Sequence, residues 1–330
     1  MKKILNRLFQ HERLSREEAR DVLNRIAAGE YNEAQLAAFL TVYLMRAMSV
    51  EELGGFRAAL LDVCIPLNVS DFDAIDLCGT GGDAKNTFNI STLASFVVAG
   101  AGGKVVKHGN YGVSSLCGSS NVMEWLGYRF SNDASKLRRE LDEAGICFLH
   151  APLFHPALKN VAPVRKALGV RTFFNMLGPL VNPARPRRQC TGVFSFELAR
   201  IYQYLLQEAD ETFAVVHSLD GYDEISLTAP AKCLTNKGER LLSPADFESE
   251  TVSPAALFGG DTVEEAGHLF LRVLENRGTE AQQNVVLANA ALALQCLSPE
   301  KSLGECRQVA AESLTSGLAM TALKRLVDLQ

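Results

Sequence analysis

Two short polar motifs carry residue types that can bind an anion. The glycine-rich segment 79–83 (GTGGD) follows the apolar run 74–78, and the basic segment 107–110 (KHGN) follows the apolar pair 105–106. Between them, segment 89–92 (NIST) places hydroxyl groups at the start of an apolar, helix-like stretch. Backbone N–H groups, hydroxyls and one ammonium would then meet at the ends of predicted strands, where an anion of phosphate size can bind.

Each motif also has a simpler interpretation. The glycine cluster can be a tight turn; it is neither a Walker A loop, which ends in Gly-Lys-Ser/Thr, nor a dinucleotide fingerprint, which needs G-x-G-x-x-G. Residues 89–92 can be an ordinary helix cap, and Lys107 can be a surface lysine. For His108 we favour an ordinary, partly buried histidine over a catalytic acid or base.

An acidic segment, 220–224 (DGYDE), follows the predicted strand 213–217. It can be a solvated turn. In a protein expected to hold phosphates, however, adjacent carboxylates after a strand are better explained as Mg²⁺ ligands, because Mg²⁺ combines one or two carboxylates with phosphate oxygens and water. Asp83 can assist through a water bound to the metal.

Arg165 lies on a helix predicted over 155–168, and Arg171 lies just beyond it. A helical arginine is usually solvated, but a guanidinium is also the natural partner of a carboxylate. The spacing of these residues leaves both interpretations open.

The elements that must position these motifs follow from patterns along the chain. The first region, from residue 1 to about 66, is helical. Capping boxes at Ser15–Glu18 and Ser49–Glu52 predict two helix starts, and Asn32 predicts a third, for a helix over 33–48. The composition changes near Pro66, which is a candidate domain boundary.

From 72 to about 230, short runs rich in Val, Ile and Phe alternate with helical segments, which predicts βαβ units and a largely parallel sheet. The predicted strands are 74–78, 104–107, 146–150, 189–194 and 212–217. Segment 169–187 is irregular and rich in proline, as expected of a crossing between domains. Segment 231–247 predicts a small hairpin, and three helices follow over 262–276, 279–297 and 302–328.

Composition narrows the class of protein. The chain has 330 residues, a net charge of −5 and a pI of about 5.8, a balance that argues against nucleic-acid binding. No apolar run approaches the roughly 18 residues that span a bilayer, so we expect no membrane contact. The eight cysteines form no C-x-x-C motif, which predicts reduced core thiols in a cytoplasmic protein rather than disulfides or a metal site.

Taken in order, the motifs resemble those of the anthranilate phosphoribosyltransferase family. The resemblance spans most of the chain and is densest between 76 and 224. It rests on segments 79–83, 89–92, 107–115 (KHGN followed by two serines), 118–119, 163–165, 171–183 (RTFFNMLGPLVNP) and 220–224.

The resemblance implies an α/β fold in which a small all-helical N-terminal domain packs beside a larger α/β domain with a mostly parallel central sheet flanked by helices. We expect the small domain over 1–70, with a contribution from about 165–188, and the large domain over 71–330. It further implies a homodimer, Mg²⁺ as cofactor, and phosphoribosyl pyrophosphate and anthranilate as substrates. The products would be phosphoribosyl anthranilate and pyrophosphate, in the second step of tryptophan biosynthesis from chorismate.

The family's site residues carry over to matching positions. For anthranilate these are Gly79, Asn110 and Arg165, and for the metal Ser91, Asp223 and Glu224. No side chain is assigned as a catalytic acid or base; Asn110 and Lys107 are expected to position the reactants, with Lys107 as a mobile positive charge. For phosphoribosyl pyrophosphate the positions are Gly79, Gly82, Asp83, Thr87, Asn89, Ile90, Ser91, Thr92, Lys107, His108, Gly109, Asn110, Ser114, Ser115 and Ser119.

The sequence departs from the family pattern at four positions near these motifs: Ser218 for Gly, Tyr222 for Leu, Asn121 for Asp, and Trp125 for a smaller residue. Because none of them removes an expected contact, they bear on local packing. Two other functions share this fold: a non-catalytic paralogue that binds nucleic acid, and an enzyme like pyrimidine nucleoside phosphorylase. The negative charge argues against the first, and the acidic pair with Arg165 argues against the second.

Overall fold

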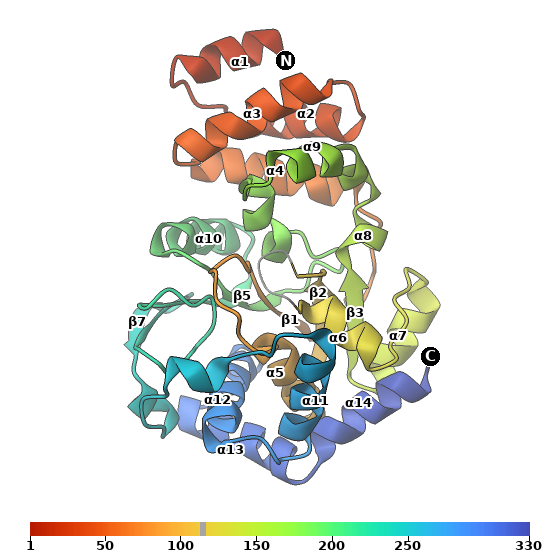
Figure 1. Ribbon diagram of the computed structural model, residues 1–330, viewed down its shortest axis with the longest axis vertical. Coiled ribbons are helices and arrows are strands. Elements are labelled where there is room, and N and C mark those ends of the chain that lie inside the picture. Colours follow the sequence, from red (N-terminus) through yellow and green to blue (C-terminus); the bar gives the residue numbers. More distant parts are fainter. Residues whose placement is uncertain (113–116) are drawn as a thin grey trace.

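The computed structural model describes residues 1–112 and 117–330. Its N-terminal part is helical, as predicted, and lies at one end of the elongated molecule (Figure 1). The three predicted caps are present: Ser15, Asn32 and Ser49 each exchange two hydrogen bonds with the third residue of the following helix. The four helices are α1 (Lys2–Phe9), α2 (Arg16–Ala27), α3 (Glu33–Met45) and α4 (Val50–Val63).

A seven-stranded sheet forms the centre of the molecule, in the order β3-β2-β1-β4-β5-β6-β7. The first five strands in this order are parallel, and β6 and β7 form the predicted hairpin at one edge. The largely parallel sheet is therefore confirmed. The strands are β1 (Ala74–Gly79), β2 (Lys104–Gly109), β3 (Ile146–His150), β4 (Arg188–Gly192), β5 (Thr212–Ser218), β6 (Ala231–Thr235) and β7 (Gly238–Leu242).

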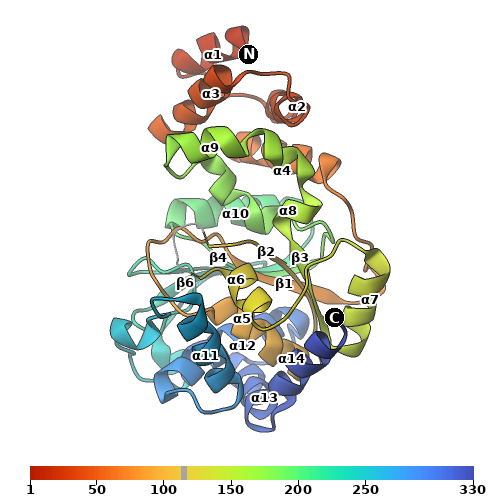
Figure 2. The same cartoon turned by 45° about the vertical axis from the view of Figure 1, so that its right-hand side comes forward.

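Helices cover both faces of this sheet, which is seen nearly edge-on in Figure 2. One face carries α10 (Phe196–Glu208) and α8 (Ala151–Phe154), with α9 (Ala162–Leu168) and the N-terminal helices beyond them. The other face carries α5 (Ile90–Gly100) and α12 (Glu280–Leu297), and α7 (Ala134–Glu143) flanks the edge at β3. The remaining helices are α6 (Ser119–Trp125), α11 (Val263–Leu274), α13 (Leu303–Thr315) and α14 (Leu318–Asp328).

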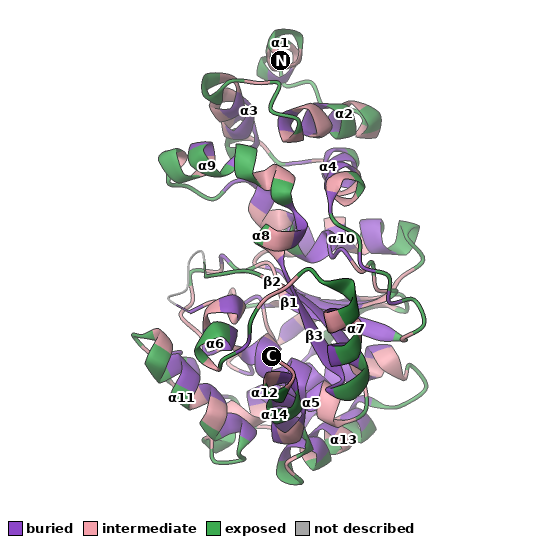
Figure 3. Cartoon of the chain, turned by 90° about the vertical axis from the view of Figure 1, so that its right-hand side faces the viewer, coloured by how far each residue is buried: buried purple, intermediate pink, exposed green. Residues whose placement is uncertain are grey.

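The period-two alternation of the strands explains these layers. In β1, Ile75 and Leu77 point into the core shared with α5 and α12, while Asp76 between them points to the other face. In β5, Phe213 and Val215 join the core on the side of α10. Figure 3 shows the strands as buried and the outer surfaces of the helices as exposed.

Two expected helices differ from the structure. The single helix expected over 302–328 is two helices, because Gly317 adopts a left-handed conformation (φ 76°) that ends α13 and starts α14. The helix expected over 155–168 begins as a 3₁₀ turn, Pro156–Asn160, and becomes α9 only at Ala162. Pro163 explains the break, because it has no N–H to donate to the preceding turn.

The irregular connection of 169–187 is present and leads from α9 to β4. It contains two 3₁₀ turns, Phe173–Met176 and Gly178–Leu180. The apolar side chains of this connection pack in the same core as helices α1 to α4. In the described residues, no helix combines the length and the apolar character needed to cross a membrane.

Candidate active site

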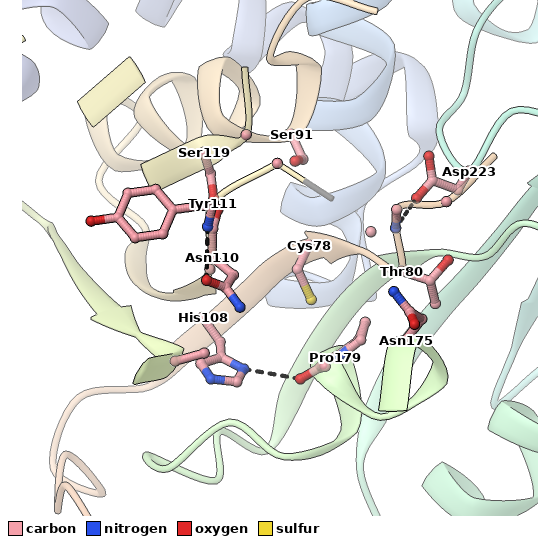
Figure 4. A pocket seen from close by; sticks show the side chains of 18 of the residues that line it. Cys78, Thr80, Ser91, His108, Asn110, Tyr111, Ser119, Asn175, Pro179 and Asp223 are labelled. Carbon is pink, nitrogen blue, oxygen red and sulfur yellow. Dashed lines mark hydrogen bonds between the residues drawn. The ribbon is translucent and has the colours of Figure 1, made fainter. Parts of the chain in front are cut away.

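The sheet places a pocket where its strand order reverses. After β1 the chain adds β2 and β3 on one side and later β4 and β5 on the other, so the carboxyl ends of β1 and β4 diverge around a crevice. Gly79 and Gly192 are paired at those ends. The crevice opens into a cavity of about 270 Å³, whose lining includes the loops after β1, β2 and β5 as well as α9 and the turn at Asn175 (Figure 4).

The glycine loop and the acidic segment meet at this point. The N–H of Gly81 donates a hydrogen bond to Oδ2 of Asp223 at 2.6 Å. A Cβ on Gly79 would stand 2.5 Å from the same oxygen, and a Cβ on Gly192 would stand 1.5 Å from the Asp223 carbonyl oxygen. Only glycine fits at either position. Gly192 was missed by sequence reasoning, because a single glycine at the end of a strand carries no local signal for a contact with Asp223.

The acidic group has the electrostatics of a cation site. Burial, followed by repulsion from nearby carboxylates, raises the pKa of Asp223 to about 7 and that of Glu224 to about 8. Oδ2 of the neighbouring Asp83 is buried and has no hydrogen-bond partner. A divalent cation would satisfy this oxygen and relieve the repulsion, so the residues fit Mg²⁺.

The described side chains contain no cluster of three or more His, Cys, Asp or Glu groups that could hold a metal.

Lys107 is placed differently from our expectation. It is only 1% exposed, and its ammonium donates hydrogen bonds to the carbonyl of Leu77 and, at 3.3 Å, to Oγ of Ser91. Burial lowers the pKa of Lys107, and the nearby carboxylate of Asp76 opposes this change. Lys107 is therefore a fixed charge at the base of the pocket rather than the mobile cation we expected.

His108 is a buried, neutral histidine. Its Nδ1 lies 2.9 Å from the carbonyl oxygen of Gly178, and burial lowers its pKa to about 3. The ring centres of His108 and His155 lie 5.3 Å apart, and burial lowers the pKa of His155 to about 4. These values exclude an imidazolium at neutral pH, so the structure favours the ordinary interpretation of His108 over an acid or base.

Arg165 reaches the pocket from α9, and its neighbours fix its orientation. Its Nη2 donates to Oδ1 of Asn175 at 3.4 Å, and its guanidinium lies 5.3 Å from the ring centre of Phe174. Burial lowers its pKa. No carboxylate pairs with it in the described part of the chain. A partly buried guanidinium of this kind is suited to a carboxylate ligand.

The loop after β2 closes one side of the pocket. The Asn110 side chain accepts a hydrogen bond from the N–H of Tyr111 at 2.8 Å, and the Ser119 hydroxyl donates to the Asn110 carbonyl at 3.3 Å. Ser114 and Ser115, expected to contact substrate, lie outside the described residues.

The departures from the family pattern have structural roles. Oδ1 of Asn121 accepts from the N–H groups of Gly112 and Gly118 at 3.0 Å each and so joins the two ends of this loop. The Ser218 hydroxyl donates to the Glu224 carbonyl and holds the acidic turn. The indole of Trp125 packs against Gly267, where a Cβ would stand 2.2 Å from its ring.

The structure brings nearly all the predicted site residues together. Those in the described part that line this one cavity together are Gly79, Gly82, Asp83, Thr87, Asn89, Ile90, Ser91, Thr92, Lys107, His108, Gly109, Asn110, Ser119, Arg165, Asp223 and Glu224. Among the lining residues that sequence reasoning did not assign are the polar side chains of Thr80, Lys85, His155 and Asn175. Figure 4 labels Thr80 and Asn175 among the side chains that line the pocket. For Asn175 a signal was available, since it lies within the 171–183 motif.

Comparison with known proteins agrees with this geometry. Residues 2–64 match the helical bundle domain of a glycosyl transferase family, and residues 71–320 match its a/b domain. The anthranilate phosphoribosyltransferase of Flavobacterium johnsoniae is 56% identical over 332 aligned positions, covering 100% of this chain and 99% of the relative.

Two solved structures are also similar. That of anthranilate phosphoribosyltransferase from Thermus thermophilus has a TM-score of 0.92 and 34% identity over 98% of both chains. The Saccharomyces cerevisiae enzyme in complex with PRPP and Mg has a TM-score of 0.90 and 26% identity, covering 98% of this chain and 96% of that one.

Proposed function

The chain belongs to the anthranilate phosphoribosyltransferase family, and we propose how the residues of its pocket perform the reaction of that family. The enzyme is a pentosyltransferase that moves the phosphoribosyl group from phosphoribosyl pyrophosphate to anthranilate, the second step of tryptophan biosynthesis from chorismate. The observation that carries the residue assignments is the contact of the glycine loop with the acidic segment, because it places phosphate-binding and cation-binding groups in one cavity.

The reaction needs stabilisation of a leaving group more than it needs a base. The amine nitrogen forms a bond to the anomeric carbon while the bond from that carbon to oxygen breaks, and pyrophosphate keeps the electron pair. The amine then loses a proton to water. Because an aromatic amine is neutral at pH 7, the site performs the reaction by binding and positioning its reactants, with favourable electrostatics for the departing phosphates.

Magnesium would be held by Asp223, Glu224 and the hydroxyl of Ser91. When bound, it would neutralise charge on the phosphates. The hydroxyls of Ser91 and Thr92 and the N–H groups of the glycine loop would bind phosphate oxygens at the start of α5. Lys107 supports this arrangement from below, since its ammonium donates to Ser91.

Anthranilate would lie between the loop after β2 and α9. Arg165 would bind its carboxylate, and Asn175 would hold the guanidinium in place. The Asn110 amide would orient the amine toward the anomeric carbon. Gly79, which leaves room for the Asp223 carboxylate, would form the wall beside it.

Neither rival function gains support. The nucleic-acid-binding paralogue would need a basic surface, whereas the net charge is −5 and the phosphate loop is complete. An activity like that of pyrimidine nucleoside phosphorylase does not explain why the Arg165 guanidinium lies in the pocket without a carboxylate partner. The similar proteins reported above are named anthranilate phosphoribosyltransferase.

We propose three further features of the whole enzyme. The small domain comprises 1–70 with about 165–188, the large domain comprises 71–330, and closing them brings Arg165 toward the glycine loop.

A homodimer forms through the helical end, supported by apolar side chains on α1 and α3 that lie open to solvent, Phe9 (59% exposed), Leu44 (45%) and Met45 (84%). Eight free, buried cysteines support a cytoplasmic location.

The deciding experiment is a fluorescence assay of anthranilate consumption. We expect anthranilate fluorescence to fall only when both phosphoribosyl pyrophosphate and Mg²⁺ are present. Two results would contradict the proposed function: a loss of fluorescence when one of the two components is missing, or no loss when both are present.

A further inference from the structure

The negative charges around the glycine loop must be balanced by cations when the pyrophosphate group is bound. Asp83, Asp223 and Glu224 all line the cavity, and phosphoribosyl pyrophosphate adds a monophosphate and a diphosphate. Lys107, which was expected to be a mobile positive charge, is instead fixed between Leu77 and Ser91. Cations other than Lys107 must therefore balance the outer phosphate of the diphosphate.

One candidate is Arg171, which lies against the glycine loop. A Cβ on Gly82 would stand 3.4 Å from both Nε and Nη1 of Arg171, so the guanidinium lies directly over this glycine. Gly82 is buried although it belongs to a loop, while Arg171 itself is exposed and meets the cavity through Gly82, which lines it. Within 1–112 and 117–330, no Asp or Glu forms an ion pair with Arg171.

The second candidate is Lys85, which follows the glycine loop and lines the same cavity. Its N–H donates to Oδ1 of Asp83 at 3.0 Å, which folds the chain back, and its ammonium lies 4.6 Å from the ring centre of Tyr222. A cation over an aromatic face is attracted by the ring without losing its charge or its donors. The described side chains give this ammonium no carboxylate partner.

Tyr222 stands where the family pattern has leucine, so the pairing of Lys85 with Tyr222 is a feature of this chain rather than of the motif. The tyrosine immediately precedes Asp223. The same turn thus carries both the cation-binding carboxylate and the aromatic ring that contacts the Lys85 ammonium.

We propose that Arg171 and Lys85 bind the outer phosphate of the pyrophosphate leaving group from two sides of the glycine loop. The inference rests on the proposed function and adds two binding residues to it. Arg165 comes from α9 and Arg171 from the connection that follows it, so these two consecutive segments present one cation to each substrate. The guanidinium offers a fork of N–H donors to phosphate oxygens, and the ammonium offers a point charge.

The test is titration calorimetry of the full chain with Mg²⁺ and inorganic pyrophosphate, without anthranilate, together with steady-state kinetics. We expect Arg171→Gln and Lys85→Gln each to weaken pyrophosphate binding by about 10-fold and to raise KM for phosphoribosyl pyrophosphate by a similar factor. The KM for anthranilate should stay within about twofold of wild type, and Arg171→Lys should recover part of the loss. Lys166→Gln, an exposed cation on α9 outside the cavity lining, is the matched control.

Equal pyrophosphate affinity in Arg171→Gln, Lys85→Gln and the Lys166→Gln control would overturn the inference. So would a rise confined to the KM for anthranilate. Circular dichroism spectra and thermal midpoints equal to wild type show that each variant is folded. A wild-type chain that neither consumes anthranilate nor binds pyrophosphate would instead refute the proposed function, and the two failures are thereby distinguished.

Discussion

The N–H of Gly81 and the carboxylate of Asp223 are 142 positions apart in the chain and are joined by a hydrogen bond of 2.6 Å. This contact brings the loop after β1 to the turn after β5, across β4, which lies between these strands in the sheet. It also uses one carboxylate oxygen and leaves the other open to a cation. The phosphate-binding and cation-binding parts of the pocket therefore depend on each other.

Replacing the acidic pair tests the cation site. Asp223→Asn keeps an oxygen that can accept from Gly81, and Glu224→Gln keeps the size of the side chain, but each removes a charge. We expect both to lower kcat and to shift the Mg²⁺ dependence of the rate to higher concentrations. Asp220→Asn is the matched control, since the Asp220 side chain is bonded to Thr228 on the exposed part of the turn. An unchanged response to Mg²⁺ in both variants would remove the pair from the metal site.

Gly192→Ala tests the close approach of β4 to the acidic turn. The new Cβ would stand 1.5 Å from the Asp223 carbonyl oxygen, so the turn must move. We expect a loss of roughly 1–3 kcal/mol in the free energy of unfolding, typical of overpacking, and a large loss of activity. Gly304→Ala, on the exposed side of α13, has only one atom at 4.0 Å and should change neither quantity much. Urea denaturation with parallel rate measurements checks this, and equal behaviour of the two variants would contradict it.

Arg165→Ala tests the anthranilate site. Because a charge-assisted contact to the substrate carboxylate is lost, KM for anthranilate should rise by about 100-fold while KM for phosphoribosyl pyrophosphate changes little. Asn175→Ala should give a smaller rise in the same constant, since it frees the guanidinium rather than removing it. If KM for phosphoribosyl pyrophosphate rises instead, Arg165 belongs to the other substrate.

The buried histidines predict how stability depends on pH. The folded protein holds His155 with a pKa of about 4 and His108 with a pKa of about 3, whereas an unfolded histidine has a pKa of about 6.5. Between these values the unfolded chain binds more protons, so the stability present above pH 6.5 is lost as pH falls. Asp76, Asp223 and Glu224 act in the opposite direction, because burial raises their pKa values to about 6, 7 and 8, and protonation removes a folded-state cost.

A His155→Gln variant isolates one of these contributions. Between pH 7.5 and pH 5.5, wild type should lose about 1 kcal/mol more free energy of unfolding than the variant does. Urea denaturation at the two pH values measures the difference. Equal losses in both proteins would show that His155 does not titrate on unfolding in this range.

The proposed homodimer is tested at its most exposed apolar side chain. Met45 is 84% exposed on α3. Met45→Glu should shift the sedimentation coefficient from dimer to monomer, because a charge in an apolar interface has no partner there. Leu318→Glu is the matched control, because it changes a half-exposed residue of α14, a helix that lies away from the N-terminal helices in Figure 1, and should leave the assembly unchanged. A wild-type monomer would end the proposal.

Local patterns in the sequence determined the elements and most of the pocket residues. The capping boxes at Ser15 and Ser49, the alternation of strands and helices, and the polar segments after β1, β2 and β5 all act over a few residues, so they can be read without a fold. The parallel sheet then follows, and parallel strands bring their carboxyl ends to one edge.

Only the tertiary structure decided which groups are buried and which distant groups touch. Lys107 became a fixed charge because β2 lies inside the sheet, between β3 and β1, and Gly192 became essential because the Asp223 turn passes over it. The places of Arg171 over Gly82 and of Asn175 beside Arg165 depend on the path of an irregular connection. Burial and contacts between distant segments are properties of the packed chain, so no short window of sequence contains them.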